Sequence, residues 1–255
     1  MLPTISQEDE FALLRLNRPE ALNALSFAII DRLSELVDQV RTMPVRALLI
    51  IGAGDKAFCA GADVKELMGR DQASQKRGAQ RGQAMMQKIA ELPIPSVALV
   101  GGYAFGGGLE LAMACTFRIA SPKAKMGLPE IKLGLIPGYG GTQRLARLIG
   151  EARAQEMILS GATIEAERAE RWGLVNAIVE GDLLSEGKAF ARRFTIYSLP
   201  VLSYAKEAVQ RSLDNPVVEG LRIEADLSTL AFQTADASEG MEAFAQKRQA
   251  VFQDR

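Results

Sequence analysis

A strand-like apolar run that ends at a glycine-rich turn occurs twice in this chain and constrains its fold more than any other feature. The first run, residues 47–51, is rich in branched side chains and is followed by GAGDKAFCAGAD. The second, residues 96–100, leads into three consecutive glycines, Gly106 to Gly108, and an apolar helix predicted for residues 109–114. Buried parallel strands are typically continuous apolar runs, and sites in α/β folds lie where such strands end. The pattern predicts an α/β fold with a site at these two turns.

The segments before and after these runs fit the same fold class. A strand is predicted for residues 10–17, and Ser26 is the predicted N-cap of an amphipathic helix that ends near Met43. A further strand is expected at residues 116–120. The polar segment 70–81 is predicted to be either a mobile loop or an exposed helix. It could act as a lid or be merely solvated.

Beyond Gly141 the chain reads as successive helices separated by Gly, Pro or Asn-Pro, with one short strand near residues 174–179. Arg144 and Arg147, in the first of these helices, are expected to face solvent. We predict an α/β core over residues 1–195 and a helical region over residues 196–255.

The helical region carries a signal for self-association. Apolar residues of the segment 216–233 cannot share one helical face, because residues two apart project in roughly opposite directions. A helix that is apolar on two faces must be covered twice, so we expect a homo-oligomer. Asp236 and Glu239 are predicted to form a capping box for the last helix.

Composition excludes several classes of function. The 255 residues include 30 basic and 31 acidic side chains, so the net charge of -1 provides no global field for nucleic acid or an anionic membrane. Histidine is absent, which excludes Ser-His-Asp, Cys-His and HExxH sites and removes the commonest nitrogen ligand for transition metals. Acid–base chemistry must therefore come from carboxylates, Lys, Tyr or Cys, and no metal site is expected.

The sequence also favours a reducing compartment. Cys59 and Cys115 have no CxxC spacing, and the acidic N-terminus does not resemble a secretory leader. Residues 97–114 have the length of a membrane span, but five glycines and Glu110 argue against one. A cytoplasmic protein without a membrane partner is expected.

The glycine turn at Gly106 to Gly108 suits an anion. At a helix start the N–H groups are unpaired and the dipole is positive, and glycine lets a ligand approach the backbone closely. No GxxxxGK[ST] or GxGxxG motif is present to indicate a nucleotide phosphate. The anion could instead be an oxyanion formed during a reaction, with one N–H donor from each of the two turns. Close packing of helix on strand explains the glycines equally well.

Two lone carboxylates flank this turn. Glu110 follows the glycines among apolar neighbours, and Glu130 lies in GLPEIKLG. A buried carboxyl without a basic partner has a raised pKa and can serve as an acid or base. The structural alternatives are dipole stabilisation of Glu110 and a salt bridge from Glu130 to Lys132. Together, the two carboxyls could add water to a polarised double bond.

Five segments of the chain resemble the enoyl-CoA hydratase (crotonase) family. They are LNRPEALNALS near the start, FCAGADVKEL at residues 58–67, GGGLELAMAC at residues 106–115, GLPEIKLGLIPGYGGTQRLARLIG at residues 127–150, and EGMEAFAQKRQAVF near the end. The resemblance covers nearly the whole chain. It implies a crotonase-like spiral of ββα units followed by a helical trimerisation region, assembled as a trimer or a dimer of trimers.

The resemblance also implies a site for acyl-CoA thioesters. By family pattern Ala62 and Gly107 supply the oxyanion-hole N–H groups, and Glu110 and Glu130 activate water and deliver a proton. The implied CoA- and substrate-binding residues are Ala60, Ala62, Asp63, Val64, Lys65 and, near the C-terminus, Lys247. No separate cofactor is implied, because coenzyme A is part of the substrate.

Some positions depart from the family pattern. Tyr139 replaces a common Ala or Gly, and Met126 and Leu128 replace a common Phe and Gln. Leu128 and Tyr139 are therefore candidate acyl-pocket residues that alter acyl-chain preference. Tyr139 could donate a hydrogen bond, although packing is the favoured role. Cys59 is interpreted as a structural residue rather than a nucleophile, since no base activates it.

The expected activity is that of a carbon–oxygen lyase, an enoyl-CoA hydratase that converts a 2-enoyl-CoA to a 3-hydroxyacyl-CoA in fatty-acid or related acyl-CoA degradation. The enzymatic alternatives are a methylglutaconyl-CoA-type hydratase and an enoyl-CoA isomerase. The non-enzymatic alternative is a crotonase-like RNA-binding or interaction protein. The pair of glutamates and the near-zero net charge weigh against that last alternative.

Overall fold

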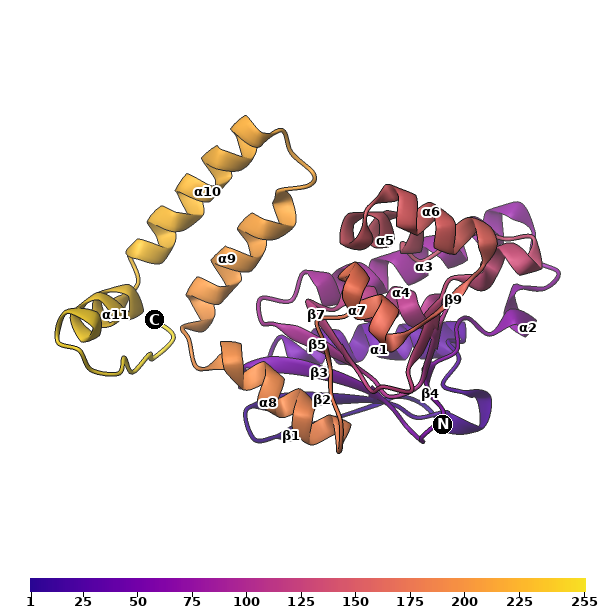
Figure 1. Ribbon diagram of the computed structural model, residues 1–255, viewed down its shortest axis with the longest axis horizontal. Helices are drawn as coiled ribbons and strands as arrows, with labels where there is room; N and C mark the ends of the chain where they lie inside the picture. Colours follow the sequence, from indigo (N-terminus) through magenta and orange to yellow (C-terminus); the bar gives the residue numbers. More distant parts are fainter. The chain divides into compact units, whose positions relative to one another are not determined.

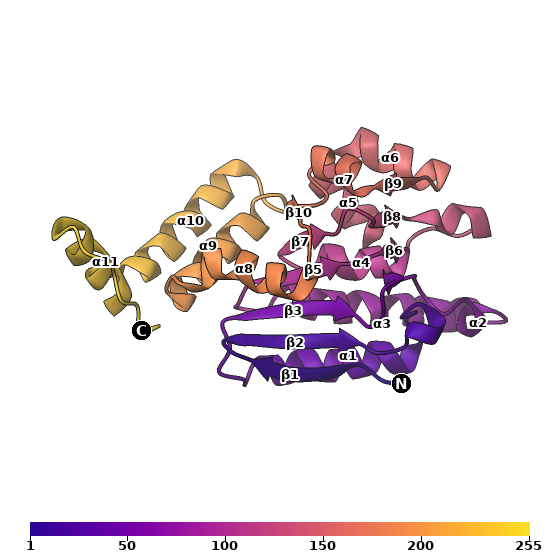
Figure 2. The ribbon, with the colours of Figure 1, turned by 60° about the horizontal axis from the view of Figure 1, so that its bottom comes forward.

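A six-stranded sheet forms the centre of the computed structural model, which describes residues 1–255 (Figure 1). Its strands, in spatial order, are β1 (Thr4–Glu8), β2 (Phe11–Leu16), β3 (Ala47–Gly52), β5 (Ser96–Val100), β7 (Phe117–Ala120) and β10 (Ala177–Ile178). Only β1 pairs antiparallel with its neighbour, and every later pairing is parallel. Figure 2 shows β1, β2 and β3 side by side. The predicted α/β class is confirmed.

The two apolar runs that the sequence singled out are adjacent in this sheet. Strands β3 and β5 pair in register from Leu48 with Ser96 to Ile51 with Leu99. Every residue of β5 is buried, as are all but one of β3. Because both faces of these strands are covered, neither shows the alternation of a half-exposed strand. The glycine turns that follow β3 and β5 consequently leave the same edge of the sheet.

A second, four-stranded sheet is built from the short strands that follow these turns. It consists of β4 (Ala57–Cys59), β6 (Tyr103–Phe105), β8 (Lys125–Gly127) and β9 (Thr163–Glu165), in that order. Each of β3, β5 and β7 is thus followed by a strand of the second sheet and then by a helical segment. This repetition is the predicted spiral of ββα units. The sequence missed β4 and β6, which lie inside glycine-rich segments.

Helices cover these two sheets. They are α1 (Phe27–Val40), α2 (Val64–Leu67), α3 (Gln72–Ala90), α4 (Gly107–Ala114), α5 (Gly141–Ile149), α6 (Glu151–Ser160), α7 (Ala166–Trp172) and α8 (Leu183–Thr195), with 3₁₀ turns η1 (Pro19–Ala21) and η2 (Pro129–Leu133). The predicted N-cap of α1 is confirmed, because the Ser26 hydroxyl accepts a hydrogen bond from the Ile29 N–H. None of the helices is long and apolar enough to cross a membrane.

Segment 70–81 is largely helical, in agreement with the second of its two predicted forms. It begins α3, whose N-cap Asp71 accepts a hydrogen bond from the Ser74 N–H. Gly78 and Gly82 lie one turn apart on the buried face of α3, while most side chains of its first half are exposed. The suggested lid motion stays a prediction.

The chain divides into two compact units, one of residues 1–92 and 96–189 and the other of residues 93–95 and 190–255. The predicted boundary lay after residue 195. In the second unit α9 (Leu199–Arg211) and α10 (Val217–Phe232) form an antiparallel pair that α11 (Ala235–Ala245) follows (Figure 1). Apolar side chains of α10, such as Val217, Leu221 and Phe232, are more than half exposed, and Leu230 on the opposite face is 47% exposed.

The predicted capping box in the second unit is wrong. Thr234 caps α11 by accepting a hydrogen bond from the Ala237 N–H. Asp236 is buried and accepts hydrogen bonds from the N–H groups of Gln253 and Asp254 in the C-terminal tail. Glu239 instead pairs with Arg248 at 2.6 Å. The two acidic residues therefore fold the tail back onto α11 rather than capping the helix.

Candidate active site

Two backbone N–H groups from different ββα units meet at the edge where β3 and β5 end. A Cβ atom built on Gly107 would lie 3.4 Å from the Ala62 nitrogen, so the two turns are in direct contact. Neither the Ala62 N–H nor the Gly107 N–H donates a hydrogen bond to another group of the protein. Gly107 begins α4, where the first N–H groups have no partner within the helix and the dipole is positive. The pair can hold an oxygen that gains negative charge.

Glycine is required for this approach at one position in particular. A Cβ atom on Gly108 would overlap the carbonyl oxygen of Cys59, which belongs to the other turn. The overlap involves main chain rather than a flexible side chain, so a shift of either turn would be needed to relieve it. Cys59 itself is fully buried, and burial raises the pKa of its thiol to about 12. Its predicted structural role therefore fits its surroundings.

Glu110 projects from the first turn of α4 into the protein interior. Its Oε1 accepts hydrogen bonds from the N–H groups of Tyr139, at 2.8 Å, and Gly141, at 2.6 Å. Burial raises the pKa of Glu110 to about 7, and the charge of Glu130 adds to that rise, while the Gly141 and Tyr139 donors oppose it. A carboxyl with such a pKa exchanges protons readily near neutral pH.

Glu130 lies in η2 on the other side of the same cavity. Its Oε1 is beside Gly106, where a Cβ atom would be 2.9 Å away, and its Oε2 is buried without a hydrogen-bond partner. Burial raises the pKa of this carboxyl as well. The alternative salt bridge is not formed, since the exposed Lys132 makes no ion pair with Glu130. A buried carboxyl oxygen without a partner, on a residue that lines a cavity, is suited to bind a water molecule or a substrate atom.

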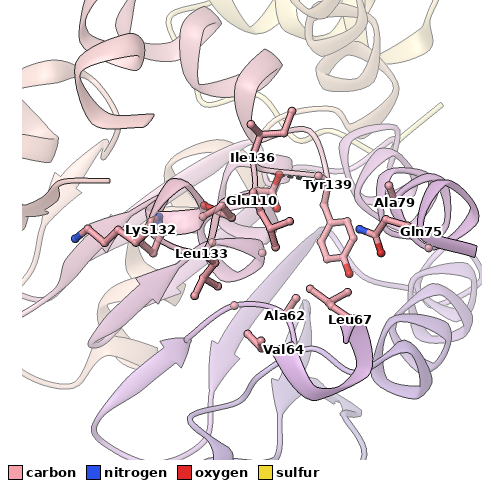
Figure 3. A pocket seen from close by; sticks show the side chains of 18 of the residues that line it. Ala62, Val64, Leu67, Gln75, Ala79, Glu110, Lys132, Leu133, Ile136 and Tyr139 are labelled. Atoms are coloured by element: carbon pink, nitrogen blue, oxygen red, sulfur yellow. Dashed lines mark hydrogen bonds between the residues drawn. The ribbon is translucent and has the colours of Figure 1, made fainter. Parts of the chain in front are cut away.

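The cavity that joins these groups has a volume of about 350 Å³ and lies within the first unit (Figure 3). Both carboxyls and both turns line it. The rest of its wall is mainly apolar and includes Val64, Leu67, Ala79, Leu133, Leu135 and Ile136. The arrangement can bind an apolar group beside an oxyanion site and transfer protons between two carboxyls.

Residues 6–255 match the protein family described as "Enoyl-CoA hydratase/isomerase". The chain belongs to this hydratase/isomerase family. A "Probable enoyl-CoA hydratase" of Rhizobium meliloti (strain 1021) is 42% identical over 252 residues, which span 98% of this chain and 97% of the relative. A "Crotonyl-CoA hydratase" of Syntrophomonas wolfei is 40% identical over 250 residues, spanning 97% and 96%.

Solved structures give the same result for the fold. The crystal structure of an enoyl-CoA hydratase from Bacillus anthracis superposes with a TM-score of 0.94 at 35% identity and covers 99% of both chains. The spiral of ββα units and its helical C-terminal region are thus those of the hydratase/isomerase family.

The structure brings most of the predicted site residues together. Ala60, Ala62, Val64, Gly107, Glu110, Glu130 and Tyr139 line the one cavity. Asp63 caps α2 and pairs with Arg18 at 2.9 Å, which lowers the pKa of its carboxyl, and Lys65 lies in the same short helix outside the cavity wall. Leu128 is fully buried and does not line the cavity. Lys247 follows α11 in the second unit, with a left-handed backbone.

Two contributions to the site were not predicted. Tyr139 and Gly141 act on Glu110 through their main-chain N–H groups, which the glycine-rich GYGG segment could have suggested. Arg144, expected to face solvent, is half-buried, and its guanidinium donates to the Tyr139 carbonyl at 3.2 Å. The physical cause is that Tyr139 is buried, so its carbonyl needs a donor within the protein, and Arg144 supplies one.

Proposed function

We propose that this chain is an enoyl-CoA hydratase that adds water reversibly to a 2-enoyl-CoA to give a 3-hydroxyacyl-CoA. The observation that carries the proposal is that the Glu110 and Glu130 carboxyls line one cavity with Ala62 and Gly107, whose N–H groups are free, and that Oε2 of Glu130 has no hydrogen-bond partner. The relatives named as hydratases support the same reaction class.

The geometry accounts for each step of this addition. The thioester oxygen binds to the Ala62 and Gly107 N–H groups, which polarises the conjugated double bond. One carboxylate takes a proton from water as the water oxygen bonds to C3, and the double-bond electrons move onto the thioester oxygen. The enolate then returns its electrons to C2, which takes a proton from the other carboxyl. Charge is conserved, because one glutamate gains the proton that the other loses.

The raised pKa of both carboxyls fits this exchange. Two neighbouring carboxyls that resist simultaneous ionisation can hold one proton between them, so one acid and one base are available together. An isomerase needs no water and no second carboxyl to activate it. The presence of both glutamates in one cavity therefore favours the hydratase over the isomerase.

The remaining parts of the proposal concern binding and assembly. Ala60, Ala62, Asp63, Val64, Lys65 and Lys247 contact the CoA portion, Leu128 and Tyr139 influence the acyl portion, and no further cofactor takes part. The protein is a cytoplasmic homo-oligomer, a trimer or a dimer of trimers, that acts in fatty-acid degradation. The exposed apolar residues of α10 support the oligomer.

Hydration of crotonyl-CoA, followed at the enoyl-thioester absorbance, tests the reaction. Glu110→Gln and Glu130→Gln should each lower kcat by about 10²- to 10⁴-fold, the usual contribution of a positioned acid or base. Gln keeps the size of the side chain but cannot exchange the proton. Unchanged turnover in both variants would overturn the mechanism. Glu91→Gln is the matched control, because Glu91 ends α3 outside the cavity.

A further inference from the structure

The side chain of Tyr139 fills a space that two glycines leave open. A Cβ atom on Gly82 of α3 would overlap the Tyr139 ring, and one on Gly107 would lie 3.2 Å from its Cδ2 atom. The ring is therefore wedged between α3 and the start of α4, and only 7% of the residue is exposed. Glycine destabilises the interior of a helix. Its presence at position 82 is explained by the space that the Tyr139 ring needs.

The ring also marks one end of the cavity. Gln75, Gly78 and Ala79 of α3 line the cavity, but Gly82, which follows them by one turn on the same helix, does not. Residues three and four apart share a helical face, so the cavity would continue along α3 to Gly82 if the ring were absent. Figure 3 shows the ring between Glu110 on one side and Gln75 and Ala79 on the other, with Ala62 and Leu67 beyond its hydroxyl end.

The hydroxyl group of Tyr139 is not needed for this packing, and a phenyl ring would fill the same space. The structure shows no hydrogen bond from the Tyr139 hydroxyl to another residue. Burial raises the pKa of the phenol to about 12, and the charge of Glu110 opposes its ionisation further, so it remains neutral. Bulk, rather than proton transfer, is what the side chain contributes.

We propose that the Tyr139 ring sets the upper limit on acyl-chain length by closing the channel along α3 between Ala79 and Gly82. The proposal rests on the proposed hydratase function and adds a substrate class to it: short-chain 2-enoyl thioesters. The main chain of Tyr139 holds Glu110 while its ring ends the cavity, so one residue couples the position of a reacting carboxyl to the length of acyl chain that reaches it.

The test compares trans-2-enoyl-CoA substrates from four to twelve carbons with the full-length chain. Tyr139→Ala should raise kcat/KM for the ten-carbon substrate relative to the four-carbon one by at least about tenfold, mostly through KM. That factor corresponds to roughly two methylenes newly buried in the opened channel. Tyr139→Phe keeps the ring and should retain the parent's ratio.

A second substitution tests the same wedge from the other side. Gly82→Ala should push the ring into the cavity and lower the relative kcat/KM for substrates of six or more carbons. In the Tyr139→Ala background the same change should be better tolerated, because the three atoms nearest to its methyl group all belong to the removed ring. Tyr103→Ala serves as a control for removal of a tyrosine ring, since Tyr103 is 39% exposed and lies outside the cavity.

The outcomes separate this inference from the proposed function. If the parent protein hydrates none of the substrates, the hydratase proposal fails. If it hydrates the four-carbon substrate and a folded Tyr139→Ala protein has the parent's chain-length ratio, only the chain-length inference fails. A ratio that changes with substitutions at Leu133 or Ile136 but not at Tyr139 would instead show that longer chains leave by the exposed rim of the cavity.

Discussion

The guanidinium of Arg144 donates a hydrogen bond to the carbonyl of Tyr139, the residue whose own N–H binds Glu110. The same guanidinium donates to Gln87 of α3 at 2.9 Å. Arg144 thus ties the loop before α5 to a neighbouring helix, and that loop and the first residue of α5 supply the two donors to the Glu110 carboxyl. We regard Arg144 as a positioning residue, because it makes no hydrogen bond to the carboxyl and instead holds the loop that does.

Replacement of Arg144 by Met should lower kcat by roughly 10- to 100-fold, because small displacements of a reacting group have effects of that size. It should also raise the pKa of Glu110, since the positive charge of Arg144 lowers it now. The acid limb of the kcat/KM profile for crotonyl-CoA should then move to higher pH.

Arg144→Lys keeps the charge and should show the smaller shift. Arg147→Met, on the exposed face of α5, is the control, and an equal shift in that variant would contradict the positioning role.

Glu110 should make the protein less stable as pH rises. Burial, the larger cause, and the charge of Glu130 raise its folded pKa from 4.5 to about 7, so the protonated form is the favoured one in the folded state. The stability gained from that form is complete below pH 4.5 and is lost as pH rises through 7. The loss by pH 8 is on the order of 3 kcal/mol.

Glu110→Gln removes this titration. Urea unfolding at pH 5 and pH 8 should therefore show that the variant gains stability relative to the parent only at the higher pH. Glu91→Gln should leave the difference between the two pH values as in the parent. If the difference in unfolding free energy between the parent and Glu110→Gln is the same at pH 5 and pH 8, the pKa of the Glu110 carboxyl is not raised in the folded protein.

Gly108→Ala should destabilise the folded chain by about 3 kcal/mol or more, since overpacking against main chain cannot be relieved by a rotamer change. The methyl group would overlap the Cys59 carbonyl. Thermal unfolding measures the effect. Gly220→Ala is the matched control, because Gly220 lies inside α10 with open space around its Cα, so the helix propensity of Ala should leave stability unchanged or higher. Equal stability of Gly108→Ala and the parent would mean that the two turns are less tightly packed than described.

Asp236→Asn should release the C-terminal tail. Burial alone would raise the pKa of this carboxyl, but its hydrogen bonds, including those from the Gln253 and Asp254 N–H groups, together outweigh burial and hold the pKa below its usual range. Asn offers one neutral acceptor oxygen where Asp236 offers two charged ones, so the substitution should lower the free energy of unfolding by about 1–3 kcal/mol. Amide hydrogen exchange over residues 250–255 should accelerate. Asp226→Asn, exposed on α10, should leave that exchange unchanged.

Local patterns predicted the parts of this structure that local forces determine. The Ser26 cap, the helix that follows it and the buried strands β3 and β5 each follow from residues near in sequence. The burial of Glu110 was also predictable, because its neighbours are all apolar. The short strand β4 was missed since its three residues pair with β6, over forty positions away.

Residues that act across the fold could not be assigned in this way. Asp236 follows a threonine that is a good cap itself, and only the return of the tail explains why its carboxyl is buried. Likewise, Arg144 has the spacing of an exposed helical residue, and its partner is a carbonyl in a loop whose path depends on tertiary packing. The position of the Tyr139 ring depends on its contact with Gly82 of α3, which is distant in the sequence.

The contact of Gly108 with the Cys59 carbonyl has an evolutionary consequence. Position 108 has room only for the hydrogen atom of glycine. Natural selection therefore cannot change the distance between the turns that carry Ala62 and Gly107 by altering a side chain there. Position 139, by contrast, holds a ring that can shrink or grow without altering the main-chain N–H that it contributes. Descendants of this chain can therefore diversify in the acyl groups they accept while inheriting an unaltered place for the oxyanion.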